Sequence, residues 1–216
     1  MNTLTGHDTG AAIQALHDRR LIEELVYRWA GARDSDDWAA LAACFHADAH
    51  IHISWISAPA DAFVNRSRAM AAGRKPGGHM KHLMSAPWIE VNGTRGFSRS
   101  NATLLIRDCI DGIWFDIESQ IRFFDRVELR DGVWRIVERT GVYDKDRIDS
   151  VGGAPSADVP WHVSALADHP PAARYLCWWL ASKGLAHLPD LIAVYSEEET
   201  RLRDVCRAWA GLPTTR

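Results

Sequence analysis

The chain has 216 residues, 47% of them hydrophobic and 25% charged, with a formal net charge of −3. This is the composition of an ordinary globular protein, long enough for one sizeable domain with an appendage. Because the sequence has no basic stripe and no apolar run of about 18 residues, it argues against a nucleic-acid partner and against a membrane span.

The cysteines and the N-terminus indicate where the protein works. Cys44, Cys109, Cys177 and Cys206 lie far apart in apolar runs and form no CxxC pair. We therefore expect buried, reduced thiols and a cytoplasmic protein. The first eight residues are polar and predict no secretory signal. Most of the ten tryptophans should lie in the core, but flat rings can also line a pocket for a planar ligand.

The first part of the chain predicts three helices around one strand. Apolar residues recur with the helical period over residues 10–32. Ser35 or Asp36 can cap a second short helix, and residues 49–55 alternate as in a strand. A third helix is expected from Pro59 to Gly73. The apolar face of the first helix holds Ile13, Leu16, Leu21, Ile22, Leu25, Val26 and Trp29. The buried face of the second holds Trp38, Leu41, Ala42 and Phe45.

From His82 to about residue 143 the pattern is all strand. The predicted strands cover residues 83–91, 96–108, 113–129 and 133–143. The turns between them are Asn92-Gly93, Asp111-Gly112 and Asp131-Gly132. Three such hairpin signals in succession predict a four-stranded antiparallel meander. Helices followed by a meander are the order of a cone-shaped α+β fold, in which a curved sheet wraps one long helix and leaves an open mouth.

Residues 151–216 are expected to form an extension to a domain of residues 1–150. Glycine and proline predict a loop-rich tether. Two short helices should follow, at about 172–183, ended by Gly184, and at about 197–210, opened by the capping box that Ser196 begins. Neither helix can bury a core alone, so we expect an arm packed on the domain or on a neighbouring subunit.

Four segments resemble the SnoaL-like branch of the nuclear transport factor 2 (NTF2) superfamily, which includes scytalone dehydratase, hexachlorocyclohexane dehydrochlorinase and bacterial bile-acid dehydratase. These segments are residues 21–27, 33–41, 79–82 and 131–139. The resemblance covers residues 10–145 and implies an NTF2-like cone, with a curved antiparallel sheet around the long N-terminal helix and a C-terminal helical arm outside it. With that arm, the chain also resembles bacterial lyases of lignin-derived diaryl diols, which release formaldehyde.

The resemblance implies a catalytic pair. In the dehydratases and the dehydrochlorinase, an aspartate after the first helix hydrogen-bonds a histidine before the next strand. Asp34 and His82 match those two positions. Arg139 matches an arginine on the last strand of the dehydrochlorinase.

The chain departs from scytalone dehydratase at two places. That enzyme has a tyrosine immediately before the aspartate, where this chain has Arg33, and Tyr27 is a candidate substitute one or two turns earlier. Its second histidine is also missing, and Asn101 or Thr103 falls near that place.

These residues predict a lyase that requires no metal or cofactor. His82, oriented by Asp34, would take a proton from a small hydroxylated, aromatic substrate. Arg139, Tyr27 or Tyr143 would stabilise the developing negative charge or protonate the leaving group, and water or formaldehyde would be lost. The candidate substrate-binding residues are His79, Asn101, Tyr143, Trp55 and Trp114.

Other interpretations stay open. An isomerase or cyclase could use the same base, and a non-catalytic subunit, such as the small subunit of ring-hydroxylating dioxygenases, would need no aligned pair. Asp34 could cap a helix, and Arg139 could form a structural ion pair with Glu138 or Glu118. A metal site built from His79, His82 and the histidines at 46, 50 and 52 lacks a known ligand spacing. We also expect a homo-oligomer, either a dimer or a trimer.

Overall fold

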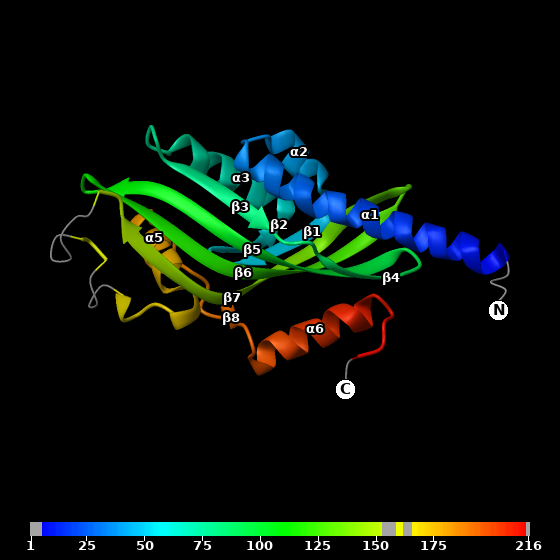
Figure 1. Ribbon diagram of the computed structural model, residues 1–216. Helices are drawn as coiled ribbons and strands as arrows, with labels where there is room; N and C mark the ends of the chain where they lie inside the picture. The colour runs from blue at the N-terminus through cyan, green and yellow to red at the C-terminus, as the bar shows by residue number, and fades with distance from the viewer. Residues whose placement is uncertain (1–5, 153–158, 162–165, 215–216) are drawn as a thin grey trace.

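The computed structural model describes residues 6–152, 159–161 and 166–214. One long, curved sheet is wrapped by helices (Figure 1): α1, α2 and α3 lie over one face and α6 lies against the opposite face. This is the α+β architecture that the sequence predicted. The helices are α1 (Gly6–Asp34), α2 (Trp38–Ala43), α3 (Ala60–Ala72), the short 3-10 helix η1 (Pro171–Ala173), α5 (Arg174–Ser182) and α6 (Glu197–Trp209). The strands are β1 (Phe45–Ile53), β2 (Ile56–Pro59), β3 (His79–Met84), β4 (Trp88–Asn92), β5 (Arg95–Ile110), β6 (Ile113–Arg130), β7 (Val133–Ser150) and β8 (Ile192–Ala193).

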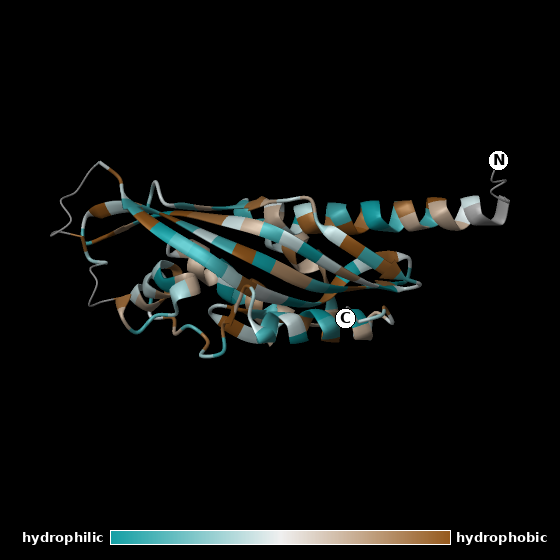
Figure 2. Ribbon diagram, turned by 60° about the horizontal axis from the view of Figure 1, so that its bottom comes forward, coloured by the Kyte–Doolittle hydropathy of each residue, from teal (hydrophilic) through white to brown (hydrophobic). Residues whose placement is uncertain are grey.

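The long helix α1 packs into the sheet with only its C-terminal half. Ile22, Leu25 and Trp29 are almost fully buried there. The N-terminal half extends past the edge of the sheet (Figures 1 and 2), which leaves Ile13 and Leu16 more than 60% exposed. The apolar face predicted for this helix is therefore a core face over part of its length.

The segment after α1 differs in detail from the sequence-based prediction. The cap of α2 is Asp37, whose carboxylate accepts a hydrogen bond from the Ala40 amide at 2.9 Å. Ser35 instead bonds back to the Gly31 carbonyl, and Asp36 takes a positive φ of 60° in the turn. Phe45, predicted on the second helix, begins β1, because the helix ends two residues earlier, at Ala43.

The sheet is mixed rather than purely antiparallel, which corrects the prediction. Its order is β2-β1-β7-β6-β5-β3, with β4 also paired to β5 and β8 to β7. The meander of β5, β6 and β7 is antiparallel, as expected, but β1 and β8 each run parallel to β7. Parallel pairing needs a long crossover between the strands, and α3 with the intervening strands supplies it for β1. The strand predicted over 83–91 is two strands, β3 and β4, which pair with successive parts of β5.

The C-terminal arm packs on both faces of the sheet. From α5, Leu176, Cys177 and Leu180 join the main core. From α6, Cys206 packs with Phe97 on the other face, in a second, smaller cluster. Ser196 caps α6 by accepting a hydrogen bond from the Glu199 amide, as predicted. The four cysteines are free and buried, which confirms that expectation. Within the described ranges, no helix is long and apolar enough to cross a bilayer.

Candidate functional site

The structure brings Asp34 and His82 into direct contact. Asp34 is the last residue of α1, and His82 lies within β3 rather than ahead of a strand. The His82 ring Nδ1 lies 2.6 Å from Asp34 Oδ1, and the backbone amide of His82 donates to Asp34 Oδ2 at 2.7 Å. A single carboxylate thus fixes both the strand and the ring, with the two residues 48 positions apart.

This contact sets the protonation of the ring. Because an ionised carboxylate only accepts hydrogen bonds, Nδ1 carries the proton and Nε2 presents its lone pair. No hydrogen bond from the described part of the chain reaches Nε2. Burial lowers the pKa of His82 below 6.5, and it outweighs the opposite effect of the Asp34 carboxylate. The imidazole is therefore a neutral base at neutral pH.

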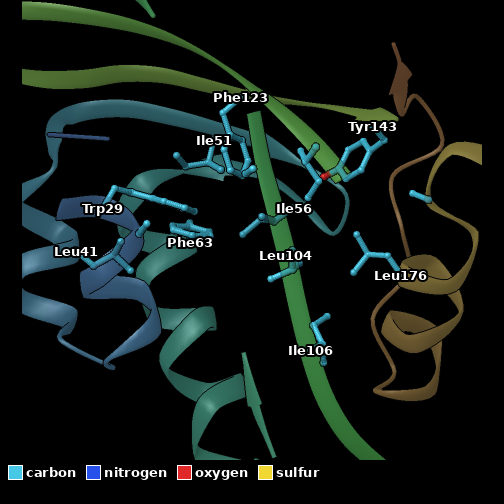
Figure 3. Close-up of a cluster of buried hydrophobic side chains, with 14 of the residues drawn as sticks. Trp29, Leu41, Ile51, Ile56, Phe63, Leu104, Ile106, Phe123, Tyr143 and Leu176 are labelled. Atoms are coloured by element: carbon cyan, nitrogen blue, oxygen red, sulfur yellow. The ribbon is translucent and has the colours of Figure 1, made fainter. Parts of the chain in front are cut away.

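His82 lines a small chamber of about 50 Å³ inside the cone. The edge of the His82 ring meets Trp29, with 5.2 Å between ring centroids and 75° between ring planes. Figure 3 shows Trp29, Phe63 and Phe123 grouped on one side of this core, with Tyr143 and Leu176 on the other. Leu176 comes from α5, so the C-terminal arm closes the chamber.

A second, larger pocket of about 330 Å³ lies next to the chamber and has walls in common with it. The residues that line both are Arg33, Trp55, Met70, Met80 and Trp179. We call this larger space the outer pocket. His79 also lines it, so two of the predicted substrate-binding residues, His79 and Trp55, lie on its wall. The outer pocket is therefore directly adjacent to the chamber that His82 lines.

Tyr143, a predicted substrate-binding residue, lies buried on the wall of the chamber. Its hydroxyl oxygen accepts a hydrogen bond from the Ser54 amide at 2.6 Å, so its own proton is free to donate. Burial raises the pKa of Tyr143 to about 12, which keeps the hydroxyl protonated. Gly141 allows this placement, because a Cβ there would lie 3.0 Å from the Tyr143 hydroxyl oxygen.

Arg139 does not lie on the cavity wall, which corrects its predicted role beside the substrate. It is fully buried and forms a bidentate ion pair with Asp125, in which Nε and Nη2 lie 2.6 and 2.7 Å from the two carboxylate oxygens. Its guanidinium lies between the rings of Trp29 and Phe123, at 4.0 and 4.5 Å from their centroids. The partner is Asp125 on the neighbouring strand rather than Glu138 or Glu118, because Asp125 is opposite Arg139 in the ladder.

Three further candidates lie away from the chamber. Tyr27 is 40% exposed on α1, where its hydroxyl is 3.4 Å from Glu23. Tyr27 is two residues from Trp29, and side chains two positions apart on a helix point in different directions. Asn101 is exposed and lines a separate surface hollow. Trp114 packs on the loop glycine at position 77. The structure therefore removes these three from the site.

Sequence reasoning missed several residues that the fold places at the site. Arg33 precedes Asp34 directly, and that adjacency was the available signal. Trp179 and Lys183 come from the arm; the Trp179 indole donates to Asp108 at 2.8 Å and the Lys183 ammonium lies 2.5 Å from the same carboxylate. No local pattern marks residues that reach the site from so distant a part of the chain. In the part of the chain that the structure describes, no three His, Cys, Asp or Glu side chains gather as metal ligands.

The known proteins that the chain is similar to agree with this fold. A model of the SnoaL-like domain matches residues 14–140, well over half of the chain. The chain belongs to the SnoaL-like domain family. A PEP2-like protein from the fungus Fusarium vanettenii is 30% identical over 183 residues, which cover 81% of this chain and 74% of that protein.

Three solved structures are similar in shape to this chain. A hexachlorocyclohexane dehydrochlorinase has a TM-score of 0.55 at 17% identity, over 67% of this chain and 98% of that one. A scytalone dehydratase candidate from Novosphingobium aromaticivorans has a TM-score of 0.54 at 20% identity, over 67% and 99%. An NTF2-like protein from the same bacterium has a TM-score of 0.52 at 19% identity, over 72% and 96%. These likenesses confirm the NTF2-like fold.

Proposed function

We propose that this SnoaL-like protein is a lyase that removes a small group, water or formaldehyde, from a hydroxylated aromatic molecule by acid–base chemistry of its own side chains. The observation that carries the proposal is the Asp34–His82 pair, whose imidazole lines an apolar chamber and whose Nε2 has no hydrogen-bond partner among the described residues. Two proteins of the same fold are named for eliminations, a dehydrochlorinase and a dehydratase candidate, which supports this class of reaction.

The base acts first. His82 Nε2 takes a proton from the substrate, and Asp34 stabilises the imidazolium that forms. When the proton comes from carbon, the C–H electron pair becomes a new C=C bond, the neighbouring C–O bond breaks, and the hydroxyl leaves as water after taking up a proton. When it comes from a hydroxymethyl group, the O–H pair becomes the C=O bond of formaldehyde and the C–C bond breaks. The electron pair released from the broken C–C bond forms a C=C bond while a hydroxyl on the neighbouring carbon leaves. This hydroxyl takes up the proton and departs as water.

The chamber and the outer pocket supply a hydrogen-bond donor and a surface for the aromatic body of the substrate. The Tyr143 hydroxyl stays protonated and donates to the oxygen on which negative charge develops. The flat rings of Trp55 and Trp179 on the outer pocket suit an aromatic body. A positioned base is worth roughly 10²–10⁴ in rate. A histidine base, rather than a carboxylate, favours elimination over the isomerase and cyclase alternatives.

The test is turnover by the purified chain with two sets of compounds, aromatic 3-hydroxy acids and diaryl propane diols. The new conjugated C=C bond is followed by ultraviolet absorbance and formaldehyde by a colorimetric assay. We expect turnover with at least one set, its loss in His82→Ala, and no change when a chelator is added. Undiminished turnover in His82→Ala, with a native circular dichroism spectrum, would overturn the proposal.

A further inference from the structure

Arg33 is a buried cation with no anionic partner among the residues that the structure describes. It is the residue before Asp34 in the last turn of α1, its side chain is 6% exposed, and it lines both the chamber and the outer pocket. Within the described ranges it makes no hydrogen bond or ion pair. Its packing contact is with the ring of Trp38, whose centroid lies 5.7 Å from the guanidinium carbon.

The two nearby carboxylates are already occupied. Both oxygens of Asp34 accept hydrogen bonds from His82, and Asp36 accepts one from Arg74 at 2.6 Å. Burial, together with the nearby charge of Arg74, lowers the pKa of Arg33 to about 10, so the side chain still carries its charge at neutral pH. Burying an unpaired charge is costly. Such a group is retained where a ligand supplies the missing anion.

The other cations of the outer pocket do not compete for that anion. Arg107 is held by Asp116 through two hydrogen bonds, at 2.7 and 2.5 Å, and Lys183 is held by Asp108 at 2.5 Å. Arg74 lines the pocket as well and is held by Asp36 at 2.6 Å, whereas Arg66 is exposed on α3. Arg33 is thus the cation placed where the pocket meets the chamber.

We propose that Arg33 binds the carboxylate of an aromatic carboxylic acid, so that the reacting carbon of the acid lies at His82. A planar guanidinium matches a carboxylate through two parallel hydrogen bonds, and its single positive charge balances the single negative charge of a carboxylate. The apolar walls hold the ring, and a pocket of about 330 Å³ suits one small molecule. That the bound acid is a substrate rests on the proposed function. That Arg33 binds a carboxylate does not depend on it.

The test measures binding, not turnover. Cinnamate, cinnamamide and phenyl phosphate are titrated calorimetrically into the full chain and into Arg33→Met, Arg33→Lys and Arg68→Met. Arg68 is exposed on α3 and does not line the pocket, so its variant is the matched control. We expect wild-type protein to bind cinnamate roughly 10- to 100-fold more tightly than cinnamamide, which corresponds to about 1.4–2.8 kcal/mol. Arg33→Met should abolish this preference, Arg33→Lys should keep part of it, and Arg68→Met should keep all of it.

Two outcomes overturn the inference. One is equal binding of acid and amide by wild-type protein, which needs no variant to fold. The other is tighter binding of phenyl phosphate than of cinnamate, which would assign the pocket to phosphate esters. His82→Gln separates this inference from the proposed function, because it should still bind cinnamate. If cinnamate binding depends on Arg33 but no aromatic hydroxy acid or diol turns over, the lyase fails and the anion site stands.

Discussion

The carboxylate of Asp34 accepts two hydrogen bonds from His82, one from the backbone amide at 2.7 Å and one from ring Nδ1 at 2.6 Å. The first bond ties the end of α1 to β3, and the second selects the tautomer of the ring. The same carboxylate therefore contributes to folding and to chemistry, and mutations of it should affect both.

Asp34→Asn should lower kcat by roughly 10²–10⁴. An amide cannot accept both hydrogen bonds and does not carry the charge that stabilises the imidazolium. Since Asp34 also raises the pKa of His82, the acid limb of the pH–rate profile should move further down in the variant. Steady-state kinetics on Asp34→Asn and on the surface control Asp48→Asn check this. Equal loss in both variants would contradict a specific role for Asp34.

The pH dependence follows from the lowered pKa of His82. The folded state holds this ring neutral below pH 6.5, so kcat/KM should stay level through pH 6.5 and fall only at lower pH. Between the folded pKa and about 6.5 the unfolded chain binds more protons. The free energy of unfolding should therefore decrease as the pH falls through that window, and be undiminished above it. Urea titrations of wild-type protein, of His82→Gln and of the exposed control His50→Gln measure this; the slope should persist in His50→Gln and weaken in His82→Gln.

Tyr143→Phe should reduce both stability and turnover. The Ser54 amide loses its acceptor, at a cost of about 1–3 kcal/mol in the free energy of unfolding, and the chamber loses its hydroxyl donor. Gly141→Ala is a milder second variant, because it crowds the Tyr143 oxygen and leaves the hydroxyl present. Urea unfolding and kcat are measured on both. A Tyr143→Phe variant that is less stable but fully active would limit this tyrosine to a structural role.

Trp179→Phe should weaken the closure of the pocket by the arm. The indole loses its hydrogen bond to Asp108, and the wall between the outer pocket and the chamber becomes thinner. We expect KM to rise several-fold and the free energy of unfolding to fall by about 1 kcal/mol. Trp88→Phe, at a residue that is 62% exposed, is the matched control. If KM is the same in both variants, Trp179 does not shape the route to His82.

The hairpins show what local chemistry decides. Asp111-Gly112 and Asp131-Gly132 each form a two-residue loop in which both residues have positive φ, between 51° and 81°. Few residue pairs adopt that conformation without strain, so the local sequence determines these turns. The caps of α6 and the burial of the cysteines were predictable for similar reasons, since each depends on neighbours in the chain.

The amino-acid sequence by itself determined the main helices, the meander of β5, β6 and β7 and, through family resemblance, the pairing of Asp34 with His82. Tertiary structure alone decided that β1 runs parallel to β7, that Arg139 pairs with Asp125, and that Tyr27 faces solvent. It also decided that Arg33 lies beside the chamber without an ion-pair partner from the described part of the chain. The physical reason is that a turn or a cap depends on φ, ψ and hydrogen bonds a few residues apart. The partner of a buried charge depends on which strands and helices meet in space.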